Sequence, residues 1–278
     1  MDLAIQALVM GLVQGLTEFL PISSSGHLIL VPWLFGWKDP FIDSVAFTVV
    51  LHMGTLVALL VYFWRDWVRL VPAGLATIRD RSFRGDPDRR LAWLLLVATI
   101  PAVAVGPIFE SKLEELVREP AAVAAMLCIG AAILWLAERW GSKARDMAGL
   151  SFAESLGIGV AQVLALVPGI SRSGISISAG LFLGLNRESA ARFSFLMATP
   201  VVGGAGIWEA RKLMTGEVGV NPSLDVTLIG FVAAAIAGLL AIRFMLEFLR
   251  RQPVYAFVAY RIAAAILVFI VLLSPHGA

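Results

Sequence analysis

Two stretches, MGLVQGLTEFLPISSSGHLIL (10–30) and IGVAQVLALVPGISRSGISIS (158–178), decide the fold. They align without a gap, so that ISSSG (22–26) falls on ISRSG (170–174). In each, an apolar run of about 15 residues is broken by Pro, Gly and Ser, and the remainder is too short to cross a bilayer, which takes about 20 residues. Broken backbone survives at membrane depth only where protein or a wet cavity covers it. The pair therefore predicts an internal duplication in which each copy is a re-entrant helical hairpin with a buried tip.

The rest of the chain has the composition of a membrane protein. Of its 278 residues, 59% are hydrophobic and 15% charged, against about 25% charged in soluble domains. Apolar blocks of spanning length predict six transmembrane helices, at 42–63, 91–109, 120–137, 189–207, 225–246 and 254–273. The single cysteine, Cys128, excludes a disulfide framework. The net charge of +2 is uninformative as a total and points to no nucleic-acid patch, so we expect no nucleic-acid partner.

Each predicted hairpin is followed by three spans, an odd number, so the second repeat enters the membrane from the opposite side. We predict an all-α polytopic membrane protein with one membrane domain (1–278), made of inverted repeats over 1–140 and 150–278. The loops on one face (64–90, 138–151, 186–192 and 243–251) hold 15 Lys and Arg, and those on the other face hold 5. The positive-inside rule makes the first face cytoplasmic and places both termini outside. We interpret 64–90 as a solvated cytoplasmic loop, with contact to anionic lipid as the alternative.

Both hairpin tips carry groups suited to an anion. The Ser-rich sequence begins the second helix of each hairpin, where free N–H groups and the helix dipole attract phosphate. Inverted repeats can bring two such helix ends together near the midplane. The hydroxyls are those of Ser23, Ser24, Ser25, Ser171 and Ser173, and Arg172 adds a forked cation. The alternatives are ordinary helix caps for the serines and a structural ion pair for Arg172.

Three further polar residues are candidates for chemistry. Glu18 lies at the negative end of its helix and needs a positive partner. Gln14 is four residues earlier on the same face, and the two oxygens suit a divalent cation such as Mg²⁺ or Ca²⁺. The alternative partner of Glu18 is His27, which is also a candidate general base, nucleophile or acid. His52, in the middle of a span, is interpreted as structural or supporting.

Two of these motifs resemble those of a known family. QGLTEFLPISSSGH (14–27) and PGISRSGIS (168–176) resemble the signatures of the bacitracin-resistance family of undecaprenyl-diphosphate phosphatases. The similarity continues through FTVVLHMGT (47–55), FSFLMATP (193–200) and AYRIAAA (259–265). Gln14 departs from the Glu that many members have, and Ser176 from their Thr.

The resemblance implies hydrolysis of a polyprenyl diphosphate lipid to the monophosphate and inorganic phosphate, which recycles the carrier of cell-wall synthesis and gives bacitracin resistance. It implies a bacterial cytoplasmic membrane location and a site open to the periplasm. Bacitracin would concern the protein only through the substrate, and the oligomeric state, a homodimer included, stays open. The implied catalytic residues are His27, Ser24, Glu18 and Arg172, the phosphate ligands Ser23, Ser25, Ser171, Ser173, Gly174 and Ser176, and the cation ligands Glu18 and Gln14.

Two rival functions remain. Inverted repeats with broken helices are also a transporter architecture, so a transporter or flippase of a phosphorylated lipid or anion is the alternative. Type-2 phosphatidic acid phosphatases carry a similar PSGH motif. They require an Arg-Pro pair and a His after the Ser-Arg of their third motif, which this chain lacks: no His stands between Arg172 and His276.

Overall fold

The computed structural model describes residues 2–83, 86–214 and 224–274, and in these ranges the chain is helical with no β-strand. The helices are α1 (Leu3–Phe19), α2 (Ser24–Phe35), α3 (Val45–Tyr62), α4 (Trp64–Asp80), α5 (Pro87–Val117), α6 (Pro120–Trp140), η1 (Met147–Gly149), α7 (Phe152–Val163), η2 (Leu164–Leu166), α8 (Arg172–Phe182), α9 (Arg187–Met214), α10 (Leu224–Arg251) and α11 (Tyr255–Leu273). Part of the predicted charge asymmetry lies outside the described residues. This concerns Arg84 and the side chains of Lys112 and Lys212.

The prediction of six spans is confirmed. Six helices are long and apolar enough to cross a membrane, and each coincides with one predicted block: α3, α5 over Pro87–Gly106, α6, α9 over Arg187–Ile207, α10 and α11. Local hydropathy suffices for this prediction because a spanning helix must satisfy its backbone internally and present apolar side chains to lipid. The chain is a multi-pass membrane protein.

The interpretation of 64–90 as a loop is wrong for its first part, because Trp64–Asp80 is the helix α4. Its buried side includes Leu70 and Ala73, and Asp66 on the same side forms an ion pair with Arg192 of α9 at 2.6 Å. An exposed apolar stripe follows the helical spacing on another side, at Trp64, Val68, Val71, Leu75 and Ile78. The many charges of this stretch conceal its amphipathic pattern.

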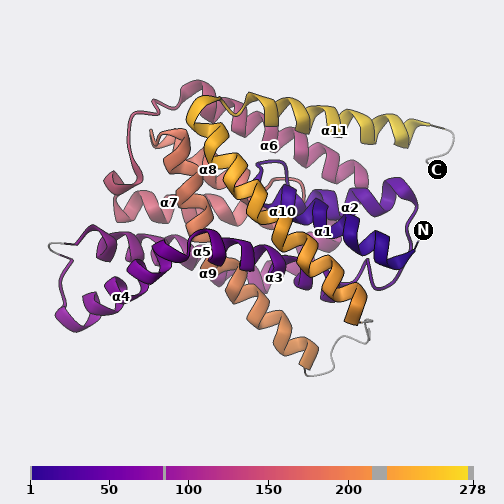
Figure 1. Ribbon diagram of the computed structural model, residues 1–278. Coiled ribbons are helices and arrows are strands. Elements are labelled where there is room, and N and C mark those ends of the chain that lie inside the picture. Colours follow the sequence, from indigo (N-terminus) through magenta and orange to yellow (C-terminus); the bar gives the residue numbers. More distant parts are fainter. Residues whose placement is uncertain (1, 84–85, 215–223, 275–278) are drawn as a thin grey trace.

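Both predicted hairpins are seen as pairs of short helices, and their re-entrant course in a membrane stays a prediction. The first is α1 followed by α2, and the second is α7 with η2 followed by α8; all four α-helices are shorter than the six spans' minimum of 18 residues. Figure 1 shows α1 and α2 towards the right and α7 and α8 towards the left, with the start of α1 and the end of α11 on the same side. This arrangement agrees with the inversion, which stays a prediction.

Small residues seat the first hairpin against α10. A Cβ at Gly11 would lie 2.4 Å from the carbonyl oxygen of Gly230, and one at Gly15 would lie 2.6 Å from that of Ala234. Such close backbone approach is typical of packing between membrane helices. The glycines therefore fix where α1 carries Gln14 and Glu18.

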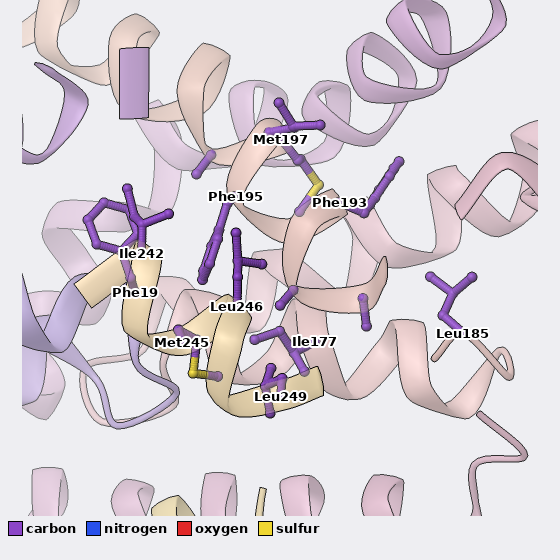
Figure 2. Packing of buried hydrophobic residues seen from close by; sticks show 14 of the residues in the cluster. Phe19, Ile177, Leu185, Phe193, Phe195, Met197, Ile242, Met245, Leu246 and Leu249 are labelled. Carbon is purple, nitrogen blue, oxygen red and sulfur yellow. The ribbon is translucent and has the colours of Figure 1, made fainter. Parts of the chain in front are cut away.

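The main apolar cluster lies beside the hairpin tips. Figure 2 shows Phe19, at the end of α1, close to Ile242 of α10 and Phe195 of α9. The rings of Phe19 and Phe195 meet edge to face, with centroids 5.5 Å apart. Ile177 of α8 belongs to the same cluster and is fully buried. One core thus supports both hairpins.

Candidate active site

The tips of the two hairpins have the same local geometry. Ser23 and Ser171 cap α2 and α8 with φ angles of 78° and 79°, a region that non-glycine residues rarely adopt. Each hydroxyl oxygen accepts from the backbone N–H three residues on, that of Gly26 at 3.3 Å and that of Gly174 at 3.1 Å. Strained backbone of this kind clusters at functional sites. The helix-cap alternative describes these two serines.

The two tips touch each other, which confirms that the motifs come together. The N–H of Gly169 in the second tip donates to the Ser23 hydroxyl at 3.1 Å. The Ser173 hydroxyl donates to the Leu20 carbonyl of the first tip at 3.0 Å. Ser25 lies 3.4 Å from Ser23, oxygen to oxygen, at the same junction.

Glu18 is the centre at which both motifs meet. Its Oε1 accepts from Arg172 Nη2 at 2.6 Å, and its Oε2 accepts from the Ser24 hydroxyl at 2.5 Å and from Gln14 Nε2 at 3.2 Å. Glu18 is 5% exposed and the Arg172 side chain 14%. Of the two partners considered for Glu18, His27 is not the one in contact; the positively charged partner is Arg172, and the divalent cation stays a prediction. Ser24 and Arg172, which occupy equivalent positions of the repeat, share one carboxylate.

His27 does not contact Glu18, which corrects the expected alternative. Its Nδ1 lies 2.7 Å from the Ser23 carbonyl, and its Nε2 lies 2.7 Å from the hydroxyl of Tyr260 on α11. A carbonyl only accepts, so Nδ1 carries the proton and, in the neutral ring, Nε2 accepts from Tyr260. The two rings also stack, with centroids 5.6 Å apart. His27 is thus held between the first tip and α11.

His52 lies closer to the site than expected. Its Nε2 is 3.8 Å from Glu18 Oε2, while its Nδ1 lies 2.8 Å from the Thr48 carbonyl. The structure thus favours the supporting role over a purely structural one. The signal in the sequence is a histidine in the middle of an apolar span, where polar side chains are expensive. Tyr260 gave no comparable signal.

The remaining predicted phosphate ligands, on the second hairpin, have side chains that are buried among other protein groups. Ser171, Ser173 and Ser176 are almost fully buried. The Ser176 hydroxyl donates to the Arg172 carbonyl at 2.7 Å and shares a hydrogen bond with the Ser194 hydroxyl at 2.6 Å. Its contacts hold the first turn of α8. At Gly174 a side chain would meet the Ser171 hydroxyl at 3.1 Å, so the absence of a Cβ keeps the cap intact.

The oxygens around Glu18 fit a cation only in part. In the described part of the chain no group of three His, Cys, Asp or Glu side chains could hold a metal ion. Gln14 Oε1, however, is buried without a hydrogen-bond partner. Turning the amide by 180° would place this oxygen towards Glu18, where a cation between the two oxygens would bind both. The residues fit an ion that takes its other ligands from phosphate and water, as Mg²⁺ commonly does.

The arrangement can activate a hydroxyl beside a phosphate site. A carboxylate within hydrogen-bond distance of a serine is the nucleophile and base pairing used in covalent catalysis. Arg172 stands next to it, and the N-termini of α2 and α8 add backbone N–H groups. Fold and site define a polytopic helical membrane protein in which Ser24, Glu18 and Arg172 form one buried polar centre.

The comparisons then identify the family. The sequence model of a protein family, described as bacitracin resistance protein BacA, matches residues 7–267, so the chain belongs to that family. The undecaprenyl-diphosphatase of Moorella thermoacetica is 44% identical over 264 residues, 95% of this chain and 96% of the relative. The undecaprenyl-diphosphatase of Rubrobacter xylanophilus is 44% identical over 270 residues, 97% and 98% of the two chains. That of Desulforudis audaxviator is 42% identical over 268 residues, 96% and 97%.

Proposed function

We propose that this protein hydrolyses undecaprenyl diphosphate to undecaprenyl phosphate and inorganic phosphate. The names of its full-length relatives support the substrate. The observation that carries the chemistry is the contact of Ser24 and Arg172 with the two oxygens of Glu18. A site within the bilayer suits a diphosphate on a long hydrocarbon chain, because the chain stays in lipid while the headgroup reaches the tips.

The hydrogen bond from Ser24 to Glu18 supports serine as the attacking group. Its oxygen forms a bond to the terminal phosphorus as its proton passes to Glu18. The bond from that phosphorus to the bridging oxygen breaks, and undecaprenyl phosphate leaves with the electron pair. Water then attacks the phosphoserine, Glu18 returns its proton to the serine oxygen, and the water protons leave with inorganic phosphate.

Arg172 offsets the negative charge that develops on the phosphate. It has five N–H donors, more than its contacts with Glu18 and with the Ser194 carbonyl at 3.4 Å use. The first-turn N–H groups of α2 and α8 lie at the same junction. We infer that His27, which is hydrogen-bonded to Tyr260, exchanges a proton with the leaving group through the Tyr260 hydroxyl.

The experiment is release of inorganic phosphate from undecaprenyl diphosphate by the purified protein. We expect Ser24→Ala, Arg172→Ala and His27→Ala to abolish phosphate release. The control is Ser274→Ala, which should retain it, because the Ser274 hydroxyl donates to the Val271 carbonyl at the end of α11. Recovery of intact lipid with the native protein would favour the transporter alternative. A chiral terminal phosphate separates the two hydrolytic routes. Two displacements through phosphoserine retain its configuration, whereas direct attack by water inverts it.

We also propose that a divalent cation, Mg²⁺ or Ca²⁺, assists at Glu18 and Gln14. When bound it supplies positive charge to the phosphate oxygens. The buried, unpartnered Gln14 Oε1 supports this site. We expect Gln14→Glu to lower the cation concentration needed for half-maximal phosphate release, and to tighten Mn²⁺ binding measured by electron paramagnetic resonance in the absence of substrate. Unchanged Mn²⁺ binding in this variant contradicts the site.

We place the protein in the bacterial cytoplasmic membrane, with both termini in the periplasm and the site open to that side. The distribution of Lys and Arg supports this orientation. Its partners are the polyprenyl diphosphate and the bilayer, bacitracin acts only through the substrate, and a homodimer is the assembly to test. The orientation is tested with an impermeant maleimide. Single cysteines are placed near each terminus in a Cys128→Ser background, and their labelling is measured in intact cells. Protection of both termini in intact cells contradicts it.

A further inference from the structure

Arg261, in the first half of α11, is completely buried and contacts both hairpin tips. Its Nη1 donates to the Pro21 carbonyl of the first tip at 3.2 Å. Its Nη2 donates to the carbonyls of Gly169 and Ile170 in the second tip, at 2.7 and 3.0 Å. Its Nε donates to the Leu127 carbonyl of α6 at 3.1 Å. One guanidinium thus joins three separate parts of the chain.

The partners of this buried cation in the described residues are carbonyl oxygens and no carboxylate. A charge placed inside a membrane protein is expensive and marks a function by default. Three of the four carbonyls, those of Pro21, Gly169 and Ile170, lie at the hairpin tips, where a broken helix leaves carbonyls without intrahelical donors. In the membrane such groups must be satisfied by protein. A planar fork with five donors can satisfy several at once and fix their separation, which a single ammonium cannot.

These carbonyls lie directly beside the reacting groups. Pro21 stands between Glu18 and Ser24 in the first tip. Ile170 is two residues before Arg172 in the second. A shift of either tip therefore changes the distance between the Ser24 hydroxyl and the Arg172 guanidinium. A misplacement of about 1 Å can lower a rate about a hundredfold.

We propose that Arg261 is a positioning residue that sets the separation of the two hairpin tips for phosphoryl transfer. This role rests on the proposed hydrolysis. Arg261 donates no hydrogen bond to Ser24, Glu18 or Arg172, and acts through the carbonyls of Pro21, Gly169 and Ile170.

Gly130 of α6 offers a way to disturb the guanidinium without replacing it. A Cβ at Gly130 would lie 1.9 Å from Arg261 Nη2 and 2.7 Å from the Ile170 carbonyl oxygen, so Gly130→Ala must displace the fork. A Cβ at Gly157 of α7 meets nothing within 4 Å. Gly157→Ala is therefore the matched control.

The test compares Arg261→Lys, Gly130→Ala and Gly157→Ala in two measurements. The first is kcat and KM for phosphate release. We expect kcat to fall about a hundredfold in Arg261→Lys and Gly130→Ala, with a smaller change in KM because the phosphate donors remain, and no change in Gly157→Ala.

The second measurement is the distance between spin labels in a Cys128→Ser background. The labels replace Leu16 on α1 and Leu164 on η2, which are exposed and occupy equivalent positions of the repeat. We expect a shifted or broader distance distribution in the two disturbing variants and an unchanged one in the control. This readout needs no activity, so a protein that releases no phosphate refutes the hydrolysis and still tests the positioning.

Three results overturn the proposal. The first is a native kcat in both disturbing variants. The second is a reduced kcat with an unchanged distance distribution. The third is failure of both variants to fold, judged by gel filtration and thermal unfolding, because Arg261 would then support the fold as a whole and not the tip separation.

Discussion

The ion pair between Glu18 and Arg172 offers a measurement that does not depend on catalysis. The two side chains lie 2.6 Å apart with 5% and 14% exposure. Removing one partner of a buried pair leaves the other charge uncompensated, which costs about 3–5 kcal/mol. We expect Arg172→Gln to lose this amount. For a chain of this size each kcal/mol corresponds to about 2–4 °C, so Tm should fall by roughly 6–20 °C.

The double variant Glu18→Gln/Arg172→Gln decides the reasoning. It leaves two neutral amides and no buried charge, so we expect it to regain most of the lost Tm, because a buried pair contributes little net stability once desolvation is included. The assay is thermal unfolding in detergent followed by tryptophan fluorescence. As a control, Arg79→Gln breaks an exposed pair with Asp80 and should leave Tm unchanged. A double variant whose loss equals the sum of the two single losses refutes the coupling.

Three further predictions concern the packing of α1 against α10, the hydrogen bond between His27 and Tyr260, and the dependence of stability on pH. Gly15→Ala places a methyl group 2.6 Å from an α10 carbonyl oxygen and should cost about 1–3 kcal/mol; an unchanged Tm contradicts this packing. Tyr260→Phe removes the 2.7 Å hydrogen bond to His27, worth about 1 kcal/mol, and should slow phosphate release roughly fivefold, whereas a native rate argues against a role for the hydroxyl. Outside the spans, the Arg145 guanidinium lowers the pKa of Glu154 from 4.5 to about 2. Its stabilisation is present above pH 4.5 and lost as pH falls towards 2, so the Tm advantage over Glu154→Gln should shrink across that window.

The hairpins could be predicted from the sequence because their signals are local. Pro21 and Pro168 follow the first helical segment of each hairpin, and a serine cap begins the second helix. The duplication reinforced the inference, because the same pattern occurs twice in the chain. In the structure, Ser23 and Ser171 accordingly have nearly the same rare φ angle. The helix α4 was missed although Val68, Val71, Leu75 and Ile78 have helical spacing, because the charge of the segment outweighed its periodicity.

The partners of the reactive groups could not be predicted, because each lies on a helix remote in sequence. Glu18 meets Arg172 154 residues further on, and His27 meets Tyr260 233 residues further on. The first contact needs the two tips to touch, and the second needs α11 to lie beside α2. Neither condition is encoded in the spacing of either motif.

The sequence by itself determined the membrane class, the six spans, the two broken hairpins and the polar residues at their tips. Hydropathy, helix breakers and caps act over one or two turns, so a single chain reveals them. The tertiary structure decided that Arg172 neutralises Glu18, that Ser24 donates to the same carboxylate, and that Arg261 ties both tips together. These contacts join segments far apart in the chain, and a buried charge takes whichever partner the packed helices bring within reach.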